Sequence, residues 1–89
     1  MPTRTVAVAS SVGLHARPAA LLASAVNDSG LDVTVALDGG EPVDAGSILE
    51  VMTLGAGHGD VVTLAAEGAD ADSVLDSLVA LLSRDLDNE

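Results

Sequence analysis

The sequence predicts an α+β fold in which helices cover one face of an antiparallel sheet. Segments with the two-residue period of strands alternate with segments of helical period, in the order strand, helix, strand, strand, helix, strand, helix. The length of 89 residues fits one domain over residues 1–89. A domain of this size leaves little room for a deep active-site cavity.

The first two elements are a strand and an amphipathic helix. Alternation predicts a strand over residues 3–9, with Val6 and Val8 on one face. A turn-rich connection over residues 10–14 leads to a helix from Ala16, and the polar run 27–30 ends that helix. Its apolar stripe is formed by residues spaced three or four apart: Ala19, Leu22 and Val26, flanked by Leu21 and Ala25.

A β-hairpin follows the helix. Residues 31–38 alternate apolar and polar side chains, which predicts a strand with one buried face. Gly39 and Gly40 supply the positive φ of a hairpin turn, and residues 41–44 return as a short strand. Pro42 indicates an edge position for it, because proline cannot donate a ladder hydrogen bond.

A short helix, a strand and a longer helix complete the chain. Ser47 and Glu50 have the spacing of a capping box, which predicts a helix from Ser47 to near Met52. A loop over residues 55–60 and a strand over residues 61–66 follow. Asp70 is the predicted cap of a last helix with Arg84 in its final turn. Its apolar positions are Ala71, Leu75, Leu78 and Leu82.

Composition excludes several classes of function. The chain has 14 Asp and Glu against 3 Lys and Arg, a formal charge of −11, and this acidity argues against nucleic-acid binding. The absence of Phe, Trp and Tyr removes platforms for base stacking, and the absence of Cys removes disulfides and thiolate chemistry. We therefore expect a cytoplasmic protein. The sequence does not distinguish salt adaptation from codon bias as the origin of the acidity.

The sequence predicts neither a membrane-spanning helix nor a metal-binding site. The longest uninterrupted apolar run is residues 18–23, whereas a membrane-spanning helix needs about twenty residues, and no signal peptide is predicted. His15 and His58 lie far apart in a chain without Cys, so we expect no metal site and no cofactor. Asp70, Asp72 and Asp76 are expected to cap and solvate the last helix.

The segment from Gly13 to Pro18 carries the strongest chemical signal. With His15 as the helix cap, the N–H groups of Ala16 and Arg17 would make an anion site at the positive end of the helix dipole. The same potential opposes protonation of His15, which keeps a ring nitrogen available as a nucleophile. A phosphoryl group on that nitrogen would be stabilised by these N–H groups and by the Arg17 guanidinium. Alternatively, His15 only caps the helix and Arg17 is an exposed cation.

The motif Leu14-His15-Ala16-Arg17-Pro18-Ala19 resembles the active-site signature of HPr, the histidine-containing phosphocarrier of the phosphoenolpyruvate-dependent sugar phosphotransferase system. The resemblance extends to Ser47-Ile48 and to Met52-Thr53-Leu54-Gly55. It implies an open-faced β-sandwich, with a four-stranded antiparallel sheet covered on one face by three helices. It also implies that His15 accepts a phosphoryl group on Nδ1 from Enzyme I and donates it to EIIA domains for sugar uptake, with Arg17 assisting. Such a protein is a carrier in a relay, not an enzyme.

Partner docking requires a modest and partly apolar surface. The candidate docking residues are Ala20 and Ala23 on the first helix and Ile48, Leu49 and Met52 on the short helix. Ile48 and Met52 could instead hold the short helix against the sheet, and we expect at least one of the two to be exposed. The partners are expected to bind transiently to a monomer.

Ser47 is a candidate regulatory site, since it matches the serine that a dedicated HPr kinase phosphorylates in some members of the family. Gly46 and Glu50 depart from the regulated pattern, in which lysine and glycine are usual, and Val12 stands where many relatives carry a hydroxyl. Two other functions stay open. One is a non-covalent regulatory or anion-binding docking module of the same fold, although docking alone requires no nucleophile. The other is a paralogue in a nitrogen-linked relay with the same chemistry.

Overall fold

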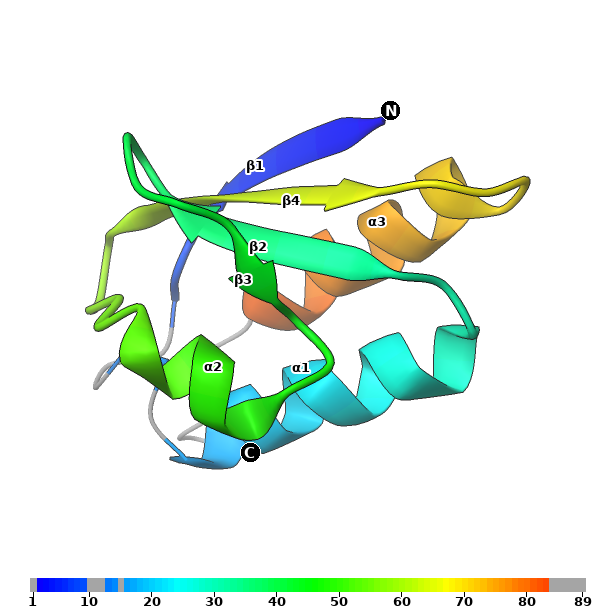
Figure 1. The fold of residues 1–89 in the computed structure, drawn as a ribbon. Coiled ribbons are helices and arrows are strands. Elements are labelled where there is room, and N and C mark those ends of the chain that lie inside the picture. The colour runs from blue at the N-terminus through cyan, green and yellow to red at the C-terminus, as the bar shows by residue number, and fades with distance from the viewer. Residues whose placement is uncertain (1, 10–12, 15, 84–89) are drawn as a thin grey trace.

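The computed structural model describes residues 2–9, 13–14 and 16–83. Within these residues the elements follow the predicted order: β1 (Thr3–Ala7), α1 (Ala16–Ser29), β2 (Val33–Leu37), β3 (Val43–Asp44), α2 (Ile48–Thr53), β4 (Val61–Ala66) and α3 (Ala71–Leu82). The strands form one antiparallel sheet in the order β1-β4-β2-β3. The helices lie on one side of this sheet and leave its other face open (Figure 1). The predicted α+β open-faced sandwich is confirmed.

The core lies between the sheet and the helices. Along β4 the side chains of Val62, Leu64 and Ala66 are buried, whereas Val61 on the opposite face is 45% exposed. The helices contribute small aliphatic side chains to this core: Ala19, Leu22, Ala23 and Val26 from α1, and Ala71, Leu75, Leu78 and Leu82 from α3. Among the described residues, the buried hydrophobic core consists of alanine, valine and leucine side chains, with no aromatic residue.

Several element ends differ from the prediction. β1 ends at Ala7, not Ala9, because Val8 N–H donates to Asp60 O and Ala9 N–H donates to Leu82 O. α1 continues through the polar run to Ser29 and ends before Gly30, which adopts φ +73. β4 matches its predicted bounds, and β3 is at the edge of the sheet, as Pro42 indicated.

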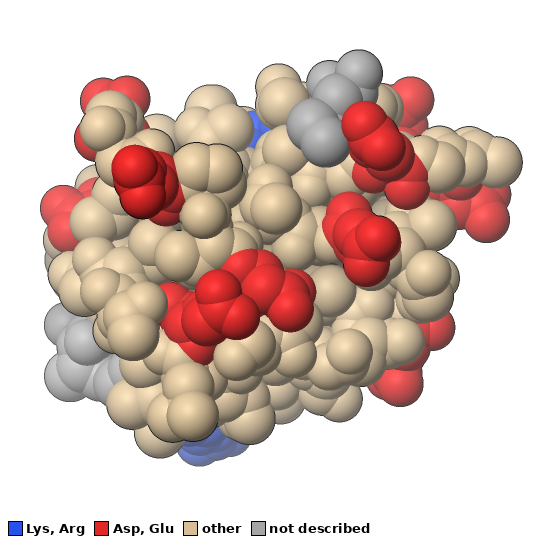
Figure 2. Space-filling view, viewed as in Figure 1, with Lys and Arg blue, Asp and Glu red and all other residues tan. Residues whose placement is uncertain are grey.

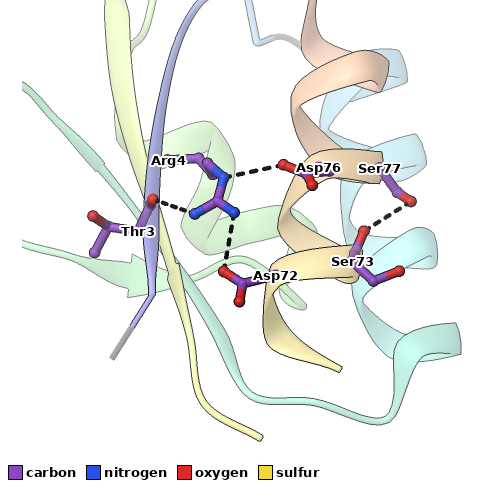
Figure 3. A network of polar contacts seen from close by, with 6 residues as sticks. All are labelled: Thr3, Arg4, Asp72, Ser73, Asp76 and Ser77. Atoms are coloured by element: carbon purple, nitrogen blue, oxygen red, sulfur yellow. Dashed lines mark hydrogen bonds and ion pairs between the residues drawn. The ribbon is translucent and has the colours of Figure 1, made fainter. Parts of the chain in front are cut away.

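A charged cluster joins β1 to α3 (Figure 3). Arg4 on β1 donates from Nη2 to Asp72 Oδ1 and from Nε to Asp76 Oδ1, both at 3.0 Å. Its hydrogen bond to Asp72 and, to a smaller extent, its hydrogen bond to Asp76 raise the pKa of Arg4 above its ordinary value. Asp72 and Asp76 are exposed, as expected of residues that solvate the helix, and in addition they pair with Arg4. Asp70 occupies the N-cap position, but its side chain makes no capping hydrogen bond.

Candidate functional site

The candidate site centres on the start of α1. This helix begins at Ala16, as predicted, and Ala16 and Arg17 are exposed while Pro18 is buried. Backbone N–H groups in the first turn of a helix have no acceptor within the helix and lie at its positive end. The first turn carries no acidic residue, although the chain as a whole is strongly acidic. The local field at the start of α1 therefore favours an anion.

Position 15 lies outside the described residues, but the segment before it is anchored. Leu14 is 5% exposed, and its N–H donates to Ala56 O at 2.9 Å. Gly13 adopts φ +78, and a Cβ at this position would lie 2.3 Å from Ala56 O. Only glycine allows this close approach between the segment before α1 and the loop after α2. The chain thus enters position 15 from an anchored residue and leaves it into a helix.

Two other sequence predictions also concern residues outside the described ranges. These are the missing hydroxyl at Val12 and the place of Arg84 in the last turn of α3. The roles of His15 and Arg17 in holding a phosphoryl group stay predictions.

The N-terminus of α2 forms only half of the predicted capping box. Ser47 is the N-cap, and its hydroxyl accepts a hydrogen bond from Glu50 N–H at 3.4 Å. The Glu50 carboxylate does not return to Ser47 N–H, which donates to Asp44 O at 3.1 Å. Instead, Glu50 Oε1 accepts from Asp44 N–H at 3.5 Å. The Glu50 carboxylate therefore bonds to the backbone of Asp44 and not to that of Ser47, and this bond connects β3 to α2.

Three of the candidate docking residues form an exposed apolar surface on α2. Ile48, Leu49 and Met52 are 42%, 76% and 42% exposed, respectively, and we call these three residues the α2 patch. Val51 is fully buried and holds the helix against the core. The expectation that Ile48 or Met52 is exposed is confirmed for both. Whether the patch docks partners stays a prediction.

The candidates on α1 divide between the two faces of the helix. Ala20 is half-buried, whereas Ala23 is 2% exposed and lies on the inner face. Ala23 follows the core residue Leu22 and precedes Val26 by three positions, so the helical period turns it inward. The prediction of Ala23 as a docking residue was therefore wrong. Leu21, expected only to flank the core stripe, is 39% exposed and was missed as a surface residue.

Asn27, which sequence reasoning also missed, connects α1 to the segment before α2. Its Nδ2 donates to Ala23 O at 2.9 Å and to Gly46 O at 3.1 Å. The second bond crosses from α1 to the residue before the N-cap Ser47. The two helices pack together beneath the sheet (Figure 1). Asn27 thus helps to fix the α2 patch relative to α1, a role that no local pattern signals.

Acidic side chains are spread over the face of the molecule that bears β3 and α2 (Figure 2). Within the described ranges, no group of three His, Cys, Asp or Glu side chains could hold a metal ion. In the same part of the chain, no helix has the length and apolar character needed to cross a bilayer. His58 is exposed in the loop after α2.

The comparison with known proteins decides the family. Residues 2–84 match the family model described as the PTS HPr component phosphorylation site. This chain belongs to the HPr family. The phosphocarrier protein HPr of Streptomyces coelicolor is 39% identical to it over 87 residues, which cover 98% of this chain and 94% of the relative. The HPr of Haloferax volcanii is 44% identical over 81 residues, which cover 90% and 91% of the two chains.

Solved HPr structures share the fold. The structure of HPr-C-His from Thermoanaerobacter tengcongensis superposes with a TM-score of 0.84 at 38% identity, covering 92% of this chain and 91% of that chain. The structure of an HPr dimer from the same organism gives 0.68 at 38% identity, over 91% and 92%. The resemblance seen in the motif around His15 is confirmed. Members of the HPr family are phosphocarriers of the phosphotransferase system, which act as transfer intermediates rather than catalysts.

Proposed function

We propose that this HPr-family chain accepts a phosphoryl group on His15 from phospho-Enzyme I and passes it to EIIA domains for sugar uptake. The observation that carries the proposal is the start of α1 directly after the His15 position, in a chain whose residues 2–84 match the HPr model. A helix N-terminus whose first turn carries no acidic residue favours the two negative charges of a phosphohistidine. Arg17, the second residue of the helix, adds a cation at the same end.

The transfer itself asks little of this small fold. In the proposed step, Nδ1 of His15 attacks the phosphorus of the donor phosphohistidine in line, a new P–N bond forms, and the donor P–N bond breaks. The donor imidazole leaves, and the negative charge of the phosphoryl group on His15 then lies beside the N-terminus of α1. In the second step an EIIA histidine repeats the attack on phospho-His15. Positioning and charge stabilisation supply the catalysis, and both are shared with the partner.

The α2 patch supplies the proposed docking surface, together with Ala20 and Leu21 on α1. Three exposed apolar side chains on a helix anchored by Val51 form a rigid and modest apolar surface beside α1. Such a surface suits rapid and reversible association, because little apolar area is buried and no segment must become ordered. We propose that the chain works as a cytoplasmic monomer, and light scattering at the assay concentration tests its oligomeric state.

The decisive experiment incubates the purified chain with Enzyme I and phosphoenolpyruvate and measures intact mass. We expect one acid-labile phosphoryl group on the wild type, none on His15→Ala, and one on the matched control His58→Ala. Arg17→Ala is expected to fold and to accept the group more slowly. A stable phosphoryl group on His15→Ala would refute the assignment of the site. Binding to Enzyme I without any mass gain would indicate a docking module, and acceptance only from a nitrogen-linked Enzyme I would indicate the paralogous relay.

Ser47 is proposed as a site where phosphorylation would weaken docking. Its hydroxyl is at the cap of α2, one residue before Ile48 of the α2 patch. A phosphate there would add negative charge at the margin of the patch. Ser47→Asp should then lower the affinity for Enzyme I relative to Ser47→Ala. Equal affinities of the two variants would end the proposal of regulation at Ser47.

A further inference from the structure

The chain has very few side chains that a mild oxidant can attack. It contains no Cys, Trp or Tyr, and its two methionines are Met1 and Met52. Thioether sulfur is oxidised readily by peroxides, and its sensitivity follows exposure to solvent. Met52 is 42% exposed, in contrast to the buried Val51 beside it. Oxidative chemistry within the described residues is therefore directed to one thioether.

That thioether belongs to the α2 patch. Ile48 and Met52 are four residues apart on a helix, so their side chains are neighbours on one exposed face. Both lie on the surface that we propose for partner docking. An unbranched thioether adapts to differently shaped partners, which favours methionine at such a surface. The redox-sensitive atom thus lies within the surface that a partner would cover.

We propose that Met52 is an oxidation site whose conversion to the sulfoxide weakens partner docking reversibly. The reaction is a two-electron transfer of oxygen from a peroxide. A sulfur lone pair attacks one oxygen, the O–O bond breaks, a new S–O bond forms, and with hydrogen peroxide the other oxygen leaves as water. The thioether is oxidised and the peroxide is reduced. A thiol-dependent methionine sulfoxide reductase restores the thioether.

The fold tolerates this change while docking does not. Backbone bonds hold the end of α2, since Met52 O accepts from Gly55 N–H at 3.3 Å and Leu54 N–H donates to Val51 O at 3.2 Å. Neither bond involves the sulfur, and the outward side chain has room for an added oxygen. In a complex, however, the sulfoxide would lose its water contacts against an apolar partner surface. A buried polar group without a partner lowers affinity by about tenfold or more.

The inference rests on the proposed relay, so phosphoryl transfer and the effect of Met52 oxidation on docking are measured separately. Intact protein is treated with hydrogen peroxide, oxidation of Met52 is verified by fragment mass spectrometry, and the Kd for Enzyme I is measured by calorimetry. We expect the affinity of the oxidised wild type to fall about tenfold, to recover after treatment with the reductase, and to be matched by untreated Met52→Gln. Circular dichroism of the oxidised protein should be unchanged.

Met52→Leu is the matched control, because it keeps an apolar side chain of similar volume and also keeps Met1. Its affinity should not respond to peroxide. An oxidised wild type that binds as tightly as before would overturn the inference, as would an equal loss of affinity in peroxide-treated Met52→Leu. If the untreated wild type takes no phosphoryl group from Enzyme I, the proposed function fails first, and that failure is visible before any oxidation.

Discussion

Replacing Gly13 with alanine should destabilise the protein strongly, because two independent costs meet at this position. Gly13 has φ +78, a conformation that costs a residue with a Cβ roughly 1–2 kcal/mol. The new Cβ would also lie 2.3 Å from Ala56 O and 2.8 Å from Gly57 Cα. Both contacts are with backbone, so a side-chain rotation cannot relieve them. The loop after α2 must move away from the segment before α1.

That movement breaks a specific interaction, from which the magnitude follows. Leu14 N–H donates to Ala56 O at 2.9 Å, and losing this bond costs about 1 kcal/mol. The reduced freedom of alanine in the unfolded chain offsets about 0.4–1 kcal/mol. The expected net loss is about 2 kcal/mol in the free energy of unfolding. For a domain of this size, such a loss lowers Tm by roughly 8–16 °C.

The assay is urea unfolding followed by far-ultraviolet circular dichroism, since the chain has no aromatic residue for fluorescence. Gly30→Ala is the matched control. Gly30 has a similar φ of +73, but nothing lies within 4 Å of a Cβ built there. Gly30→Ala therefore reports the backbone cost alone, and the difference between the two variants reports the steric cost. If Gly13→Ala unfolds at the same urea concentration as Gly30→Ala, the close approach of the two segments is refuted.

Three further predictions concern stability. Leu22→Ala should lower the free energy of unfolding by roughly 2–5 kcal/mol, because the side chain is fully buried beneath the sheet; urea midpoints measure this loss. Ser47→Ala should cost about 0.5–1 kcal/mol, at the low end for an N-cap because its hydrogen bond to Glu50 N–H is 3.4 Å long; thermal unfolding measures it. Arg4→Gln should reduce Tm slightly at low ionic strength and not at about 1 M salt, where charges on the surface are screened.

Each of these predictions has its own control. Leu49→Ala removes a leucine that is 76% exposed and should change the free energy of unfolding by less than about 0.5 kcal/mol. Ser47→Thr, which keeps a hydroxyl at the N-cap of α2, is the control for Ser47→Ala and should cost less. The pKa of Arg4 is raised in the folded protein, so the positive charge that forms its ion pairs contributes fully to stability below the ordinary pKa of arginine. Salt, rather than high pH, is therefore the practical way to weaken these ion pairs. A salt-independent loss in Arg4→Gln would show that its aliphatic stem, rather than its charge, holds β1 to α3.

Elements with a strong local period could be predicted from the sequence. The bounds of β4 and the start of α1 matched the structure, and the buried positions of α3 matched its apolar stripe. Periodicity and capping are properties of neighbouring residues, so they can be read before the chain is folded. The HPr signature around His15 is likewise contiguous, which is why the family could be inferred from one short motif.

Pairing between distant segments could not be predicted in this way. Arg4 meets aspartates 68 and 72 positions away, and the Glu50 side chain bonds to Asp44 N–H instead of completing its own cap. The sequence alone was enough to predict the order of the elements, the start of α1 and, through the contiguous motif around His15, the family. Tertiary packing alone decided which surfaces remain open and which charges pair, because both depend on where segments far apart in the chain come together.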